Sequence, residues 1–309
     1  VNGTGYKTFA EAVAAIVKDC TVEIYEAGTY KVPNISAGNV TVKGMVDGVV
    51  FDCTGSGSIA SLTNTVTFEN VTFNMGQSNY HGFQHAGTIN MVGCTINGLF
   101  FSYGDMNFTD CHFVQETKEY NMWLYGGDIS FDNCVFEGNG KYFNVYNEGR
   151  AATPDKITVK DCVAINNGSA NKAVFNVKET CGATVLTYDV AIEGTNVLVG
   201  AFPAASESSS LTVLNGFVQV DDKNPNPTED GKDVVVSSAD DAKLAEVAKS
   251  DYDTAKASGE AAVETLLSNA ASKATDMEIS YSTPETPKPV KVNGTGYKTF
   301  AEAVAAIVK

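Results

Sequence analysis

The sequence predicts a mainly β protein: a right-handed single-stranded parallel β-helix with an N-terminal capping helix, followed by a small helical segment. First, five segments share one eight-residue template in which apolar and polar residues alternate, as in half-buried strands. Second, no helical stretch separates these segments, which argues against strand–helix–strand units. The segments are VTFENVTF (66–73), INMVGCTI (89–96), MNFTDCHF (106–113), ISFDNCVF (129–136) and ITVKDCVA (157–164).

The template also contains a fixed turn position. Its fifth residue is Asn, Asp or Gly, which adopt left-handed backbone more readily than other residues. Because stacked coils lie roughly 4.8 Å apart, the template predicts a polar ladder at one corner and a row of cysteines inside. Parallel side chains at this spacing favour free thiols over disulfides. The small residues after the turn are Val71, Cys94, Cys111, Cys134 and Cys162.

The first residues of the chain predict a cap for the open end of the β-helix. Residues 9–17 (FAEAVAAIV) have the spacing of an amphipathic helix, and Thr8 with Glu11 forms a capping box. Short strands are expected in TVEIYEAGTY (21–30) and VTVKG (40–44). A helix at this place covers a sheet end that would otherwise invite aggregation.

This order of segments, with the repeated F-x-N-C-x-F pattern, resembles the pectin-lyase-like β-helix superfamily. Within that superfamily it is most similar to adhesin-like cell-surface proteins of bacteria and archaea, which are often giant and repetitive. The resemblance covers about residues 1–215. It implies the fold and an extracellular location at the cell surface, and it names no ligand.

The composition changes after residue 215 and divides the chain into further segments. Residues rich in Pro, Asp and Asn indicate a linker, and a stretch rich in Ala, Glu, Lys and Leu indicates short helices. The predicted organisation is a capping helix plus parallel β-helix (1–215), a linker (216–233), a small helical or α+β segment (234–282), a Pro-rich linker (283–291) and the start of a next repeat (292–309).

Residues 292–309 are identical to residues 1–18, VNGTGYKTFAEAVAAIVK. Residue 1 recurs at residue 292, which sets a period of 291 residues. This period is far longer than the 20–50 residues or so of solenoid repeats, so it indicates a tandem array of whole domains. We expect the second copy of the helix to dock neighbouring units onto each other through Phe300, Val304 and Ile307.

The charge of the chain excludes some partners. The formal net charge is −16 with a single arginine, Arg150, so binding to nucleic acid or to an anionic membrane surface is not expected. No apolar run reaches the roughly 18 residues of a membrane span. His81, His85 and His112 lack a metal-binding spacing. We therefore expect no cofactor and no metal.

A second set of strands carries the aromatic residues. It consists of GFQHAG (82–87), LFFSYG (99–104), NMWLYG (121–126), YFNVYN (142–147) and AVFNVK (173–178). In each strand, one set of alternate positions is apolar and suits the core. The other set, which has the opposite parity, predicts an outward face with few charges. Inverted parity would place these rings in the core instead, and the 234–291 tail could alternatively cover them. The rings are Phe101, Tyr103, Trp123, Tyr125 and Tyr146.

These features predict a structural and adhesive repeat unit of an extracellular fibre or surface adhesin. Its units are joined in tandem, and its partners are neighbouring copies and a glycan or a host or cell-surface protein. The alternative is a polysaccharide lyase or glycoside hydrolase, because Asp105 and Asp128 precede equivalent strands and are expected to stack. Two solvated turn carboxylates would look the same in the sequence. A spacer without any ligand is the third interpretation.

Overall fold

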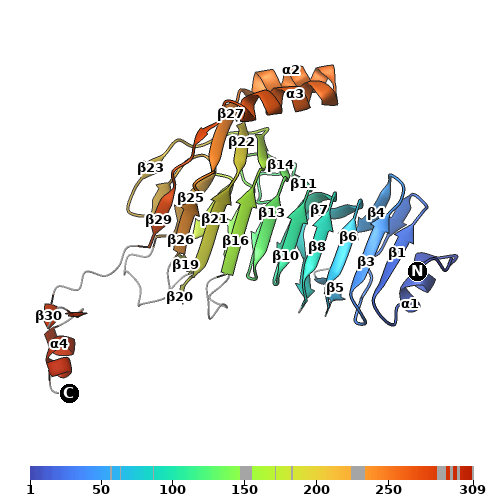
Figure 1. Cartoon of the computed structure of the whole chain (residues 1–309), viewed down its shortest axis with the longest axis horizontal. Coiled ribbons are helices and arrows are strands. Elements are labelled where there is room, and N and C mark those ends of the chain that lie inside the picture. The colour runs from blue at the N-terminus through green and yellow to red at the C-terminus, as the bar shows by residue number, and fades with distance from the viewer. Residues whose placement is uncertain are drawn as a thin grey trace.

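The computed structural model describes the chain except for residues 56–57, 63, 86, 147–154, 171, 182–183, 224–233, 284–289, 293–294, 298–299 and 308–309. The described part is mainly β, with strands arranged in long parallel sheets that run the length of the molecule (Figure 1). This architecture is compatible with the β-helix-like fold that the sequence predicts.

One sheet contains ten strands in the order in which they stack. All neighbours are parallel except the last pair, β26 and β29, which is antiparallel. The strands are β1 (Cys20–Ile24), β3 (Val40–Gly44), β6 (Val66–Glu69), β8 (Ile89–Val92), β10 (Met106–Thr109), β13 (Ile129–Asp132), β16 (Asp155–Lys160), β21 (Tyr188–Glu193), β26 (Val234–Ser238) and β29 (Ser280–Ser282).

The strands between those of the first sheet form two further parallel rows, which share the long strands β7 (Thr72–His85) and β9 (Thr95–Ser102). One row also contains β2 (Gly28–Tyr30), β4 (Val49–Asp52), β11 (His112–Val114), β14 (Val135–Gly138), β17 (Val163–Asn166), β22 (Thr195–Val199) and β27 (Lys243–Val247). The other row also contains β5 (Ser58–Leu62), β12 (Met122–Leu124), β15 (Phe143–Val145), β18 (Phe175–Lys178) and β25 (Val218–Asp221).

The predicted turn position adopts left-handed backbone in every template segment. The φ values are 53° at Asn70, 61° at Gly93, 54° at Asp110, and 53° at both Asn133 and Asp161. The Asn133 amide donates to the Asp110 carboxylate at 2.6 Å, so part of the predicted polar ladder is confirmed. A side chain at Gly93 would place its Cβ 2.6 Å from Asn70 Oδ1, which explains the glycine in this column.

The predicted inner row of cysteines is also confirmed. Cys94, Cys111, Cys134 and Cys162 are at most 1% exposed, and all of them are free thiols. The residue after each of the last three donates its amide to the carbonyl of the cysteine one coil earlier, at 2.8–2.9 Å. The interior beside this row is filled mainly by phenylalanine rings and aliphatic side chains.

Helix α1 (Phe9–Ala14) lies at the first end of the stack and begins with the predicted capping box of Thr8 and Glu11. The Phe9 ring lies 5.3 Å from the Tyr30 ring, and Ala12 is buried. The helix ends at Ala14, earlier than the apolar pattern predicts, because the following residues turn the chain into β1 and leave Val17 77% exposed.

The parallel sheets continue beyond residue 215, where the sequence analysis placed the end of the β-helix. Strand β26 pairs in parallel with β21, and β27 pairs in parallel with β22. The reason is the alternation of residues 234–238, in which buried Val234 and Val236 lie opposite Tyr188 and Val190 of β21 and continue their apolar row. Antiparallel strands β23 (Ser206–Glu207), β24 (Leu211–Val213), β28 (Thr275–Asp276) and β29 complete this end.

The predicted helices of the 234–282 segment are α2 (Lys249–Ser258) and α3 (Glu260–Ala271). Together they form a hairpin on top of the last coils (Figure 1). The remaining elements are β19 (Thr180–Cys181), β20 (Thr184–Val185), β30 (Val290–Val292), β31 (Thr295–Tyr297) and α4 (Phe300–Ile307). No helix in the described part of the chain has the length and apolar character needed to cross a membrane.

Candidate functional site

Register between β9, β12 and β15 places the aromatic residues side by side. Trp123 pairs with Phe101 on one side and with Asn144 on the other. Their strand neighbours Phe100 and Met122 are completely buried in the core. Because successive side chains of a strand point to opposite faces, the aromatic residues lie on the outward parity. The alternative with inverted parity is therefore wrong.

The five predicted rings form one group, which we call the aromatic cluster. The Tyr103 and Tyr125 rings stack at 5.0 Å with an interplanar angle of 11°, and the Trp123 ring lies 6.0 Å from Tyr125 at 23°. Phe101 approaches Tyr103 edge-on at 5.3 Å, and Tyr146 approaches Trp123 edge-on at 5.8 Å. Each of the five side chains is half-buried, because the ring faces lie largely against one another.

Two further rings belong to this surface and were missed in the sequence. Tyr80 and Tyr120 contact Trp123 edge-on at 5.7 Å and 5.8 Å. Tyr80 lies in the irregular middle of β7, where register shifts interrupt the pairing, and Tyr120 precedes β12. Neither position belongs to the eight-residue template, so only the density of aromatic residues could have indicated them.

Two polar atoms are buried among these rings. Trp123 Nε1 and the Tyr80 hydroxyl are both enclosed by the surrounding rings. Burial raises the pKa of Tyr80 to about 12, and the nearby Trp123 indole opposes this shift. Buried polar groups are usually paired, and the Trp123 indole is a partner of the Tyr80 hydroxyl inside the cluster.

The last coil that touches the cluster supplies a cation and a thiol. The Tyr146 hydroxyl lies 2.7 Å from Cys181 Sγ. The Lys178 ammonium group lies 6.0 Å from the centre of the Tyr146 ring, at the outer limit of a cation–π contact. Lys178 and Cys181 thus border the cluster on the side of Tyr146.

The tail helices do not cover the cluster. Helix α3 contacts β22 and β27, and its Val263, Leu266 and Leu267 pack with buried residues of that row. Residues 224–233 and 284–289 of the tail lie outside the described residues, so the prediction that the tail covers the rings is tested only for the helices.

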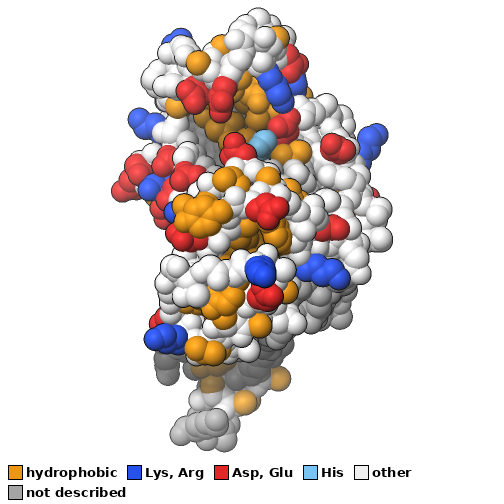
Figure 2. Space-filling model, turned by 90° about the vertical axis from the view of Figure 1, so that its right-hand side faces the viewer, with side chains coloured by type: hydrophobic (Ala, Val, Ile, Leu, Met, Phe, Trp, Pro, Cys, Tyr) orange, Lys and Arg blue, Asp and Glu red, His pale blue; other side chains and the backbone are white. Residues whose placement is uncertain are grey.

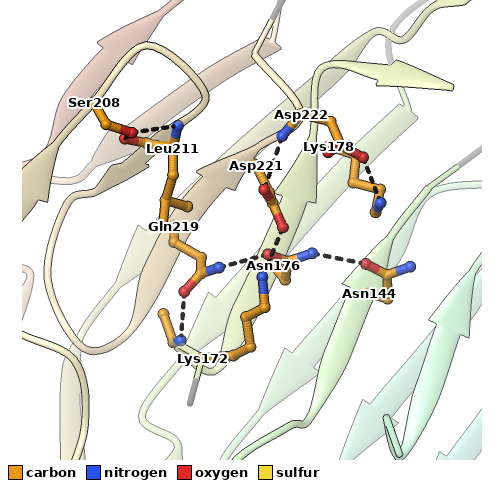
Figure 3. A network of polar contacts seen from close by, with 10 residues as sticks. Asn144, Lys172, Asn176, Lys178, Ser208, Leu211, Gln219, Asp221 and Asp222 are labelled. Atoms are coloured by element: carbon orange, nitrogen blue, oxygen red, sulfur yellow. Dashed lines mark hydrogen bonds and ion pairs between the residues drawn. The ribbon is translucent and has the colours of Figure 1, made fainter. Parts of the chain in front are cut away.

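The row that contains Phe101 and Trp123 continues as a ladder of buried amides (Figure 3). The Asn176 side chain donates to Asn144 Oδ1 at 2.9 Å, and Gln219 donates to Asn176 Oδ1 at 2.6 Å. All three side chains are at most 1% exposed. The sequence analysis missed this ladder, although Asn follows Phe in both YFNVYN and AVFNVK.

Two ion pairs lie beside the amide ladder. Lys172 contacts Asp221 at 2.7 Å, and Lys178 contacts Asp222 at 2.5 Å (Figure 3). Burial by itself would raise the pKa of Asp221, but the hydrogen bond and charge of Lys172 outweigh it and lower that pKa. The Asp221 carboxylate is therefore an ionised partner of Lys172 rather than a proton donor.

The aspartates of the enzymatic alternative stack as expected, but their oxygens bind backbone. Asp105 Oδ1 accepts from the Asp128 amide at 2.9 Å, and Asp128 Oδ1 accepts from the Lys156 amide at 3.0 Å. Each carboxylate thus closes the turn of the next coil. These hydrogen bonds are those of structural turn residues, and they account for both carboxylates without a catalytic role.

His112 has a carboxylate partner. Its Nε2 lies 3.3 Å from the Glu137 carboxylate. The ammonium group of Lys256, on α2, lies 3.2 Å from the same carboxylate. The hydrogen bond from His112 is the main reason that the pKa of Glu137 is lowered to about 2. Among the described residues no group of three or more His, Cys, Asp or Glu side chains could hold a metal ion.

The fold and this surface define a mainly β protein of stacked parallel strands with a half-buried aromatic cluster on its outside. Comparisons with protein-family models, with curated proteins and with solved structures find no match for this chain. Its function is therefore argued from its own residues.

Proposed function

We propose that this chain is a structural and adhesive repeat unit of an extracellular fibre or surface adhesin. Its core is a right-handed single-stranded parallel β-helix, related in design to the pectin-lyase-like superfamily. The observation that carries the proposal is the recurrence of residues 1–18 at 292–309 in a chain built from a long stack of parallel strands. Such a stack is a rod, and tandem rods make a fibre.

The strand order supports the finer description of the fold. From β1 to β26, each strand of the ten-stranded sheet pairs in parallel with the strand one coil later, for example β10 with β13 and β13 with β16. Between them the chain crosses the other two rows. Crossover connections between parallel strands of one sheet are right-handed in roughly 98% of cases, which supports a right-handed winding.

The geometry of the aromatic cluster favours a polypeptide as the bound partner. A sugar ring stacks on the open face of an aromatic ring, whereas Tyr103, Tyr125 and Trp123 turn their faces mainly toward one another. Ring edges instead suit the apolar side chains and backbone carbonyls of another protein. In a fibre, the partner present at the highest local concentration is a neighbouring copy.

The proposal is tested by self-association of the purified chain. Sedimentation velocity at rising concentration should show association that is lost in Trp123→Ala, because the central ring of the cluster is removed. Val235→Ala is the control, since Val235 is 38% exposed and lies on β26, outside the cluster. A chain that stays monomeric but binds a glycan array through Trp123 would identify a glycan ligand instead. A blank result in both assays would favour a spacer.

A further inference from the structure

The first end of the stack contains a groove of about 710 Å³ between residues 1–9 and the strands β1 and β2. Among the described strands, β1 pairs only with β3, and β2 pairs only with β4. Figure 2 looks at this end and shows hydrophobic side chains gathered in its middle, with charged side chains around them. This end of the molecule therefore offers strand edges that pair with no further strand, next to apolar surface.

A tight turn borders the groove. Asn2 and Gly3 both have left-handed backbone, with φ of 48° and 81°, as a type I′ hairpin turn requires. Thr4 donates its amide to the Val1 carbonyl at 2.9 Å, and the Val1 amino group donates to the Thr4 carbonyl at 2.8 Å. The Asn2 amide donates to the Thr21 carbonyl at 3.0 Å, and the Thr21 amide donates to Asn2 Oδ1 at 3.0 Å. These two bonds hold the turn against β1.

The second copy of this segment extends the same hairpin by two residues. Strands β30 and β31 are antiparallel, with Val292 opposite Thr295, Lys291 opposite Gly296 and Val290 opposite Tyr297. Because residues 292–309 repeat residues 1–18, the pair Val292 and Thr295 corresponds to Val1 and Thr4. The additional residues of the hairpin arm come from the end of the Pro-rich linker.

We infer that the end of each unit's linker, Val290–Lys291, forms a strand along Gly5–Tyr6 of the following unit and lies in the groove at the first end of its stack. The inference rests on the tandem arrangement of the proposed function. The occupant of the groove is thus the linker of the preceding copy, placed there by a hairpin whose turn is already bonded to Thr21.

The groove has the room and the charge for this strand. A Cβ added at Gly5 would meet no atom within 4 Å, and Tyr6 is 42% exposed. Glu23 and Glu26 line the groove together with Lys7, so its lining carries more negative than positive charge and suits the linker, whose last residue is Lys291. Strand pairing also fixes the direction in which the chain enters the next unit, so the junction is a structured joint rather than a free spacer.

Limited trypsin digestion of a chain of two complete units tests the inference. Cleavage after Lys291 at the junction should be slower, by about ten-fold, than cleavage after Lys291 in the 309-residue chain, where no second stack follows. Val290→Pro at the junction should restore rapid cleavage, because proline lacks the N–H of the strand. Val290→Thr keeps both the N–H and a β-branched side chain and should remain protected.

The controls separate this joint from the proposed adhesive surface. Val290→Pro placed in the last linker of the two-unit chain has no following stack and should leave cleavage at the junction unchanged. Trp123→Ala should not alter it either, so loss of self-association and loss of protection are independent results. Equal cleavage rates at Lys291 in the one-unit and two-unit chains would overturn the inference.

Discussion

Glu137 on β14 and Lys256 on α2 are joined by a contact of 3.2 Å across 119 residues of sequence. With His112 and Asn167 as further donors, Glu137 links the helical hairpin to the face of the stack. The depressed pKa of this carboxylate makes the link sensitive to acid.

The first prediction concerns pH. The pKa of Glu137 is about 2 in the folded chain and about 4.5 when unperturbed, so its stabilising contribution is complete above about pH 4.5 and is lost as the pH falls toward 2. Glu137→Gln should remove about 1 kcal/mol at pH 7, after allowance for solvent screening, and flatten the pH dependence in this window. Urea unfolding at a series of pH values measures both effects. If the free energy of unfolding of Glu137→Gln changed with pH as steeply as that of the unaltered chain, Glu137 would not be the group responsible.

The second prediction concerns thiol reactivity. A neighbouring Cys134 thiol raises the pKa of Cys111 to about 12, and the inner row is buried. Because the thiolate is the reactive species, iodoacetamide at pH 8 should modify the partly exposed Cys20 and Cys181 first. Peptide mass spectrometry of the labelled chain reads out each site. Equal labelling of Cys111 and Cys20 before unfolding would show that the row is not interior.

The third prediction concerns the turn column. Gly93→Ala should lower the free energy of unfolding by about 1–2 kcal/mol, because its left-handed φ disfavours a Cβ and that Cβ would meet Asn70 Oδ1. Gly55→Ala is the control, since nothing lies within 4 Å of the added atom. Chemical denaturation of the two variants should differ. A Gly93 variant as stable as the Gly55 variant would remove the steric explanation.

The fourth prediction concerns the amide ladder. Asn176→Ala should cost about 2–4 kcal/mol, because it leaves buried amides of Asn144 and Gln219 without their shared partner. Asn107→Ala breaks a similar ladder on the outer face of the first sheet, between Asn90 and Ser130, where water can replace the lost bonds. Its cost should be below about 1 kcal/mol. Thermal unfolding of the two variants measures the difference. An equal loss of stability in Asn176→Ala and Asn107→Ala would show that burial does not set the cost.

The sequence predicts the parallel strands and the aromatic cluster because both follow from alternation and register. A template with Asp110 and Asn133 at the same position fixes which strands are neighbours, and parity then brings Phe101 beside Trp123. These relations hold wherever one coil repeats the previous one.

The features that the sequence does not predict depend on departures from that repetition. Tyr80 reaches Trp123 only because register shifts interrupt β7. Strands β26 and β27 pair with β21 and β22, although a long insertion separates the two pairs in the sequence. Because the composition changes within this insertion, the residues after it look like a separate segment. The alternation in VVVSS could have indicated the continuation, because buried Val234 and Val236 continue the apolar positions of β21.

The direction of the strands has a mechanical consequence. The parallel strands lie across the long axis of the molecule, and the N-terminal end and β29 lie at opposite ends of the stack (Figure 1). Tension along a fibre of such units would therefore load the hydrogen bonds between coils one row after another, as in opening a zipper. Each unit would lengthen stepwise at low force and absorb energy before the chain itself is strained.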